Sequence, residues 1–191
     1  DEIINGLSYS EFRKLTDELL KENKTTGKNQ SDKLLEYTRL NVYRMSRIDS
    51  KIKLFDVLAD KILSLKDKYY WIVLAEAWCG DAAQNLPVIA KMKYVSPNIE
   101  LKILLSTEHN EILDKYLTNE SRSIPKVICL KQDSLEELFL WGPRPADAQS
   151  IIMENKTTEN PLSKEEIHQK LHLWYAKDKC SCIQQEFMEL I

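Results

Sequence analysis

The chain has 191 residues, of which 43% are hydrophobic and 30% are charged, and its formal net charge is −3. This composition is typical of a globular protein, and the length suits one domain with additions that buries a core without disulfide staples. The scattered lysines and arginines argue against a nucleic-acid partner, and the lack of any apolar window of 18 residues argues against a membrane span.

The cysteines indicate a compartment. There are four of them, Cys79, Cys129, Cys180 and Cys182, which is too sparse for a disulfide scaffold and favours a reducing, cytoplasmic location. The first residues, "DEIINGLSYS", do not have the pattern of a secretory signal. The sequence leaves open whether a signal was removed before Asp1.

The first 68 residues are predicted to be helical, with a loop at 23–30. Ser8 or Ser10 is expected to cap the first helix, residues 31–48 form the second, and Asp49 or Ser50 caps the third. The apolar positions at helical spacing are Phe12, Leu15, Leu19 and Leu20, then Leu34, Leu35, Thr38, Val42 and Met45, then Ile52, Phe55, Leu58, Ile62 and Leu65.

The middle of the chain alternates between strand and helix patterns. The run "YYWIVLAEAW" (69–78) is short, apolar and rich in aromatic and branched residues, which predicts a buried strand. The segments that follow are a helix at 81–94, a strand at 99–106, a helix at 108–117, and strands at 125–132 and 134–142. Residues 163–190 are predicted to form one long helix or two in series.

This order predicts an α/β fold with a mixed four-stranded sheet flanked by helices. Strands joined by helices are expected to run parallel with a right-handed crossover. The last two strands are joined by the short polar turn "KQDS" (131–134), so they are expected to be antiparallel.

Cys79 occupies a favourable position for thiol chemistry. It lies where a strand ends and a helix begins, and ligands of open α/β sheets gather beyond the carboxyl ends of the strands. A helix N-terminus contributes unpaired N–H groups and a partial positive charge. Both favour a thiolate.

The segment "AWCGDAAQNLP" (77–87) resembles the active-site segment of the thioredoxin superfamily, in which Trp-Cys-Gly-Pro-Cys opens a helix. Trp78, Cys79 and Gly80 match that motif, and Pro87 stands where the family's helix kinks. More narrowly, "WCGDAAQ" with "WGPRPADAQ" (141–149) is similar to a bacterial thioredoxin-like subfamily that lacks the second cysteine.

Downstream segments carry the same resemblance. "RSIPKVICL" (122–130) is similar to the family's strand that begins at a cis-proline, here Pro125 after Ile124, and Gly142 matches the glycine after the last strand. The resemblance implies a three-layer thioredoxin-like core at 50–150 in a single domain of 1–191. Residues 1–49 are then an N-terminal helical extension and 151–191 a C-terminal helical segment.

Departures from the family pattern affect the expected chemistry. Ala82 replaces the resolving cysteine, and Asp81 replaces the proline. Val73 stands where thioredoxins place a buried acid, so Glu76 is either its replacement or a strand residue facing solvent. The helix terminus favours a thiolate by about 0.3–1 kcal/mol, and Asp81 opposes it by about 1 kcal/mol. Cys79 is therefore expected to be less activated than a thioredoxin cysteine unless Arg144 or a lysine approaches it.

Because position 82 is an alanine and not a cysteine, a mixed disulfide on Cys79 needs a thiol from elsewhere for its release. That thiol is external, such as glutathione, or it is Cys180 or Cys182. Cys129, in mid-strand, is expected to be a small buried hydrophobe. The bland interpretation of Cys180 and Cys182 is two semi-exposed helix cysteines.

Three other groups have two interpretations each. His168 and His172, one helical turn apart, could bind zinc with Cys180 and Cys182 only if the helix breaks near Ala176, so the preferred prediction is no metal and no cofactor. Arg144, stiffened between Pro143 and Pro145, binds an anion or pairs with Asp81 or Glu76. Arg44 and Arg47 line a groove or face water.

Two functions follow from the resemblance. The favoured one is a single-cysteine thiol-disulfide oxidoreductase that acts through Cys79, and the alternative is a redox-inactive binding module for a peptide or protein. The expected partner is a protein or a low-molecular-weight thiol, and the added helices favour a specialised partner such as a second copy of the chain, giving a homodimer. The residues expected to bind substrate, in the second case by strand addition beside the cis-proline, are Trp78, Gly80, Asp81, Ile124, Pro125 and Arg144.

Overall fold

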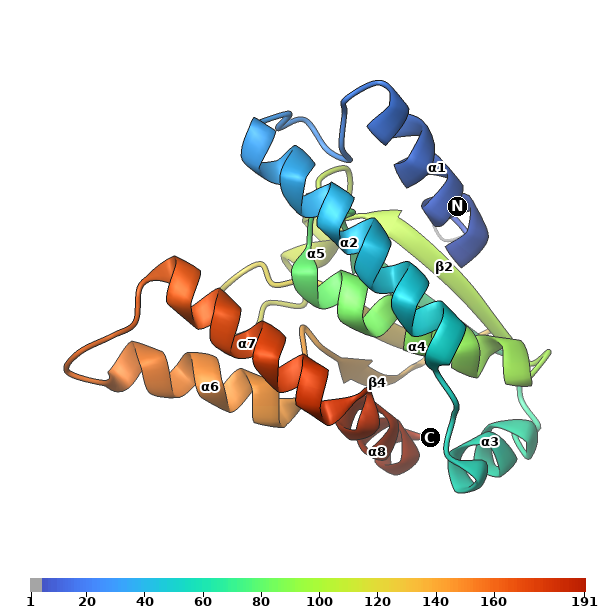
Figure 1. Ribbon diagram of the computed structural model, residues 1–191. Coiled ribbons are helices and arrows are strands. Elements are labelled where there is room, and N and C mark those ends of the chain that lie inside the picture. Colours follow the sequence, from blue (N-terminus) through green and yellow to red (C-terminus); the bar gives the residue numbers. More distant parts are fainter. Residues whose placement is uncertain (1–4) are drawn as a thin grey trace.

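The computed structural model describes residues 5–191, which form four strands and eight helices (Figure 1). In chain order the elements are α1 (Tyr9–Lys21), α2 (Asp32–Lys51), α3 (Asp56–Leu63), β1 (Tyr69–Ala75), α4 (Gly80–Val95), β2 (Ile99–Leu105), α5 (Asn110–Leu113), β3 (Lys126–Lys131), β4 (Glu137–Trp141), α6 (Ala146–Thr157), α7 (Lys164–Asp178) and α8 (Ser181–Leu190). Within this part of the chain, no helix is both long and apolar enough to cross a bilayer.

The helical start of the chain agrees with the prediction except at one boundary. Ser8 caps α1 through a reciprocal capping box with Glu11. The expected cap of the third helix at Asp49 or Ser50 is wrong, because α2 continues through both residues to Lys51. Met45 and Ile48 keep the buried face of α2 in contact with the core up to that point. α3 begins only at Asp56, after extended backbone.

The sheet has the order β2-β1-β3-β4, with β1 parallel to β2 and β3 antiparallel to both β1 and β4. The expectation that the third strand runs parallel to the first two is therefore wrong. A connection between two parallel strands must run back along the full length of a strand, which for β2 is about 23 Å. The predicted helix at 108–117 shrinks to the four residues of α5, about 6 Å of helix, so the chain re-enters from the end at which β2 left.

The hydrophobic pattern did not predict α6, although this helix overlaps the expected C-terminal helical segment 151–191. α6 follows Pro145, its N-cap residue, whose missing N–H is not needed for a helical hydrogen bond. Of the two alternatives for residues 163–190, the structure has two helices. α7 and α8 are separated by Lys179 and Cys180, both in the left-handed conformation, with φ of 53° and 65°.

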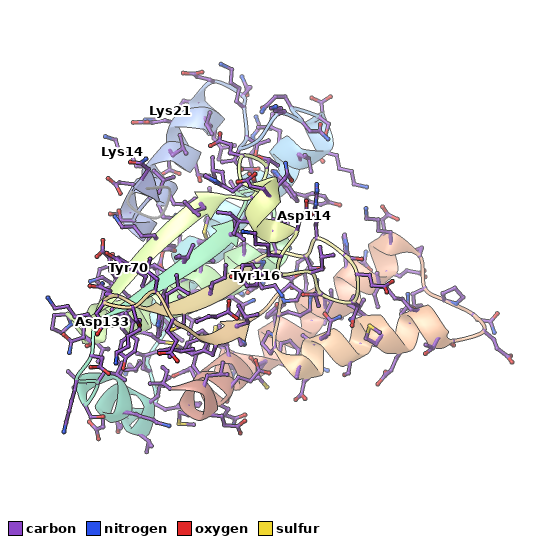
Figure 2. The ribbon with its side chains drawn as sticks, turned by 180° about the vertical axis from the view of Figure 1, so that it is seen from behind. Lys14, Lys21, Tyr70, Asp114, Tyr116 and Asp133 are labelled. Carbon is purple, nitrogen blue, oxygen red and sulfur yellow. The ribbon has the colours of Figure 1, made fainter. Side chains whose placement is uncertain are left out.

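The two faces of the sheet differ. One face and helices α2, α3, α4 and α8 enclose the larger core, whose centre holds Trp71, Leu86, Ile89 and Phe187. α2, α4 and α7 lie side by side on this front of the molecule (Figure 1). Figure 2 shows the other face, where Tyr70 and Tyr116 lie beside a smaller cluster of Ile72, Leu74, Leu104, Leu113 and Ile128. The front face therefore carries the helices that surround Cys79.

Candidate functional site

Cys79 is the N-cap residue of α4, as the strand–helix pattern predicts. Its Sγ accepts the Ala82 N–H at 3.4 Å, and its thiol donates to the Ile124 carbonyl at 3.3 Å. Only 9% of Cys79 is exposed. The sulfur therefore lies against the backbone of the loop before β3 with both of its hydrogen-bonding roles used.

That loop contains the first of two cis peptide bonds, Ile124–Pro125 and Gly142–Pro143. The cis-proline expected from the resemblance is thus present at Pro125. The two loops are in close contact, because a Cβ added to Gly142 would lie 2.2 Å from the Pro125 carbonyl oxygen. Only glycine permits this approach at the φ of +111° that Gly142 adopts.

Asp81 connects three elements beside the cysteine. Its Oδ2 accepts from Arg144 Nη2 at 2.7 Å, and its Oδ1 accepts from the Tyr175 hydroxyl at 2.6 Å. Asn85, one turn along α4, donates both to the Asp81 carbonyl and to the Tyr175 hydroxyl. Of the partners that the sequence left open for Arg144, the structure shows Asp81, which ties the loop after β4 and helix α7 to the start of α4.

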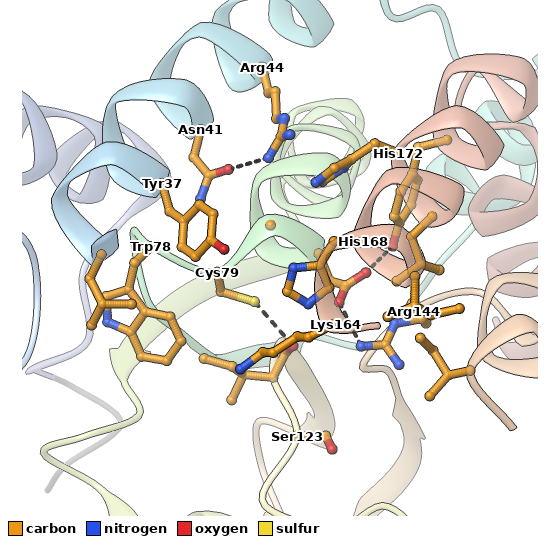
Figure 3. Close-up of a pocket in the computed structure, with 18 of the residues that line it drawn as sticks. Tyr37, Asn41, Arg44, Trp78, Cys79, Ser123, Arg144, Lys164, His168 and His172 are labelled. Atoms are coloured by element: carbon orange, nitrogen blue, oxygen red, sulfur yellow. Dashed lines mark hydrogen bonds and ion pairs between the residues drawn. The ribbon is translucent and has the colours of Figure 1, made fainter. Parts of the chain in front are cut away.

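A cavity of about 420 Å³ lies in front of Cys79 (Figure 3). It is bounded by α2, the start of α4, the cis-proline loop, α6 and α7. Figure 3 shows Tyr37, Asn41 and Arg44 reaching it from α2, and Lys164, His168 and His172 from α7. Its apolar lining consists of Leu34, Trp78, Ile124, Ile152, Ile167 and Leu171. The helical additions at both ends of the chain therefore enclose the site.

The surroundings of Cys79 keep its thiol protonated. Burial first, and the Asp81 carboxylate second, raise the pKa of Cys79 to about 12. The Ala82 and Asp81 backbone N–H groups and Arg144 act in the opposite direction but do not compensate. The effect of Asp81 was expected from the sequence, but the larger effect, burial of the sulfur, was not.

The structure brings most of the predicted site residues together. Trp78, Cys79, Gly80, Asp81, Ile124 and Arg144 all line the cavity, and Pro125 is joined to Ile124. Arg44 lines it too, which decides between the two interpretations of that residue. Cys180 and Arg47 instead line a separate cavity of about 440 Å³, and Cys182 donates to Asp147.

Two further residues are buried away from the cavity. Cys129 is 1% exposed, as expected for a small hydrophobe, and burial raises its pKa to about 12. Glu76 does not face solvent. It is fully buried and accepts from the Ser106 hydroxyl and from the backbone and side chain of Thr107. Glu76 does not line the cavity with Cys79.

Sequence reasoning did not assign Tyr37, Asn41, Lys164 or Tyr175 to the site. Asn41 is fully buried, with its amide nitrogen on the Ala77 carbonyl and its oxygen on Arg44. The signal was present in α7, where Lys164, His168, His172 and Tyr175 recur at spacings of three and four residues. The same helix buries Ile167 and Leu171, and all of these residues line the cavity, whereas the exposed Leu173 does not.

The histidines of α7 do not form a metal centre with the nearby cysteines. No group of three or more His, Cys, Asp or Glu side chains in residues 5–191 is arranged to hold a metal ion. The helix breaks at Lys179 and Cys180 instead of near Ala176. His168 and His172 face the cavity, whereas Cys180 lines the other one.

His172 makes stability depend on pH. Burial and the neighbouring Arg44 lower its pKa to about 4. Below pH 6.5, His172 is therefore protonated in the unfolded chain while it is still neutral in the folded protein. Stability is therefore expected to fall as the pH drops from 6.5 towards 4. Allowing for partial exposure, we expect a loss of about 1 kcal/mol between about pH 7 and pH 5.

Urea unfolding of the wild type and of His172→Gln at these two pH values measures this effect. The variant should lose less stability on acidification than the wild type does. An equal loss in the wild type and in His172→Gln would contradict the assignment.

Comparison with known proteins agrees with the fold. A family model described as thioredoxin matches residues 27–160. A protein of unknown function from Pseudomonas aeruginosa has a TM-score of 0.60 and 19% identity, with 96% of each chain covered. An HIV epitope scaffold has a TM-score of 0.57 and 19% identity, with 96% of this chain and 97% of the scaffold covered. No curated protein matches in sequence. The fold, the cis-proline beside Cys79 and the match over most of its length show that the chain belongs to the thioredoxin family.

Proposed function

We propose that this chain is a binding module on a thioredoxin fold, which holds a small ligand in the cavity beside Cys79 without thiol–disulfide turnover. One observation carries the proposal. Cys79 contributes the only sulfur that lines the cavity within residues 5–191, and its buried thiol donates to the Ile124 carbonyl. A nucleophilic cysteine needs an accessible thiolate, but only 9% of Cys79 is exposed and its surroundings raise the pKa of the thiol.

The expected loss of thiolate at Cys79 is large. An ordinary cysteine with a pKa near 8.5 is roughly 3% thiolate at pH 7. With the pKa of Cys79 raised to about 12, the thiolate fraction is on the order of one in 100,000. Reaction with disulfides should slow by about two orders of magnitude, because the loss of thiolate outweighs the greater nucleophilicity of a more basic thiolate.

The shape of the site favours a small ligand over an extended polypeptide. Side chains of α2 and α7 form the walls in front of the cis-proline loop, where an extended polypeptide would have to lie. A volume of about 420 Å³ lies within the range of small-molecule sites. The Ile124 carbonyl, which an added strand would use, already accepts the Cys79 thiol.

A second candidate is the single-cysteine oxidoreductase. The Ala82 N–H on Sγ at 3.4 Å and the attraction of Arg144 both favour a thiolate. In that case the thiol that releases the mixed disulfide would be external, because Cys180 and Cys182 do not line the cavity.

Incubation of the native protein with oxidised glutathione distinguishes the two functions. In the reaction, the Cys79 thiolate would attack one sulfur of the disulfide, form a mixed disulfide and release one reduced glutathione. We expect mass spectrometry to find Cys79 unmodified at pH 7 in the folded protein and modified after unfolding in urea.

The matched control is Cys79→Ser, which should lose only the urea-dependent modification at that position. Rapid formation of the Cys79 mixed disulfide at pH 7, followed by its release by reduced glutathione, would overturn the binding module and support the oxidoreductase.

A further inference from the structure

The charges that line the cavity are unbalanced. The wall of the cavity contains one carboxylate, Asp81, and four cationic side chains, Arg44, Arg122, Arg144 and Lys164. Asp81 is occupied by Arg144, with an Nη2–Oδ2 distance of 2.7 Å. Arg122 is paired with Asp114 outside the cavity through two hydrogen bonds.

Two cations remain. Across residues 5–191, neither Arg44 nor Lys164 has a carboxylate within ion-pair distance, although both line the cavity. Figure 3 shows them on different walls, with Arg44 on α2 and Lys164 at the start of α7. Both walls therefore contribute positive charge to the cavity.

Arg44 is held in place without being neutralised. Its Nη1 donates to Asn41 Oδ1 at 2.9 Å, and Asn41 is itself fixed by its bond to the Ala77 carbonyl. Burial and the repulsion of Arg47 lower the pKa of Arg44. A half-buried guanidinium whose partner is a neutral amide keeps N–H donors without partners, and its lost hydration is not offset by a counter-charge. An anion in the cavity would accept from those donors and supply that charge.

The first turn of α4 adds to this positive potential. Gly80 lies directly beneath Arg44 and His172, because a Cβ at Gly80 would lie 3.7 Å from Arg44 Nη1 and 3.4 Å from His172 Cε1. The partial positive charge of the N-terminus of α4, a helix of 16 residues, therefore faces the same space as Arg44.

The rest of the wall is apolar. Trp78, Ile124 and Leu34 line the cavity on the side of α2 and the cis-proline loop, and Ile152 and Leu171 on the side of α6 and α7. A bare inorganic ion would leave this surface uncovered. The wall is complementary to a ligand with one charged end and one apolar end.

We propose that the cavity binds a small organic anion that carries a carboxylate or phosphate group on an apolar body. Its anionic group faces Arg44 and Lys164, and its apolar body packs against Trp78 and Ile124. This assignment rests on the proposed binding function and names the ligand's chemical class.

The test uses phenyl phosphate and benzoate as anionic probes, and benzamide as a neutral probe of the same shape as benzoate. Titrations are followed by calorimetry and by the amide NMR signals of Gly80 and His172. Both anions should bind at least about tenfold more tightly than benzamide. Their affinity should fall as salt rises from about 50 mM to about 500 mM.

Charge-removing variants locate the site. Arg44→Gln and Lys164→Gln should each weaken phenyl phosphate binding by about tenfold or more. Their matched controls, Arg47→Gln on α2 and Lys170→Gln on α7, do not line this cavity and should bind as the wild type does. Arg44→Lys keeps the charge and should retain most of the affinity.

Three results would overturn the assignment: no binding of either anion at about 10 mM, equal binding of benzamide and the anions, or unchanged phenyl phosphate binding in Arg44→Gln. Equal binding of neutral and anionic probes would still leave a binding module. Modification of Cys79 by oxidised glutathione at pH 7 would overturn the proposed function and leave the anion site intact.

Discussion

Replacement of Gly142 by alanine is expected to lower the free energy of unfolding by about 3 kcal/mol. The new Cβ would lie 2.2 Å from the Pro125 carbonyl oxygen, and the φ of +111° is unfavourable for any residue with a Cβ. The atom in its way belongs to the backbone, so no side chain can rotate to make room. The loop beside Cys79 must therefore move.

Gly27→Ala is the matched control. Gly27 also has a positive φ, +81°, but its Cβ would meet only the side chain of Thr107, at 3.0 Å. We expect a smaller loss there, of about 1–2 kcal/mol, from the backbone conformation and a shift of the Thr107 side chain. Urea unfolding of both variants measures the difference, and equal losses would show that the contact with Pro125 is unimportant.

Replacement of Asp81 by asparagine is expected to cost about 3 kcal/mol of folding stability at neutral pH. The side chains of Asp81 and Arg144 are only 14% and 15% exposed, so loss of the carboxylate leaves a buried guanidinium without a counter-charge. The same change should lower the pKa of Cys79, because Asp81 is the second largest cause of its elevation.

Asp114→Asn provides the control for this prediction. Asp114 also pairs with an arginine, Arg122, but both side chains are about half exposed, and surface pairs contribute at most about 1 kcal/mol. A loss in Asp81→Asn no greater than in Asp114→Asn would contradict the role of Asp81 as the buried link between α4, α7 and the loop after β4.

The sequence was most informative about the centre of the fold. Hydrophobic runs ending at Gly80 and Gly142 are local features that can be read without knowing the rest of the fold. They predicted four strands and the position of Cys79 at a helix start, both of which the structure contains. The cis-proline beside Cys79 was predicted from the resemblance to the thioredoxin superfamily, and it too is present.

Strand direction and helix limits were harder to predict because they depend on distant contacts. The direction of β3 depends on how far α5 extends, and α5 is only four residues long. The extent of α2 depends on Met45 and Ile48 remaining in the core. The spacing of hydrophobic residues alone predicts neither the length of α5 nor the end of α2.

The environment of Cys79 was the part of the site least accessible from sequence. Its neighbours along the chain predicted a nearly neutral balance for the thiolate. The dominant effect is burial, and the Ile124 carbonyl that contacts the sulfur is 45 residues away in sequence. The proposed preference for an anionic ligand also depends on distant parts of the chain, because Arg44 and Lys164 line the same cavity from α2 and α7.

Site-resolved NMR titration of the Cys79 ¹³Cβ signal, assigned with Cys79→Ser, tests the central claim most directly. A thiol that remains protonated in a binding cavity predicts no titration step for Cys79 between about pH 6 and pH 10. A midpoint at or below about 8.5, the value of an unperturbed cysteine, would contradict that claim and favour thiol–disulfide chemistry at this sulfur.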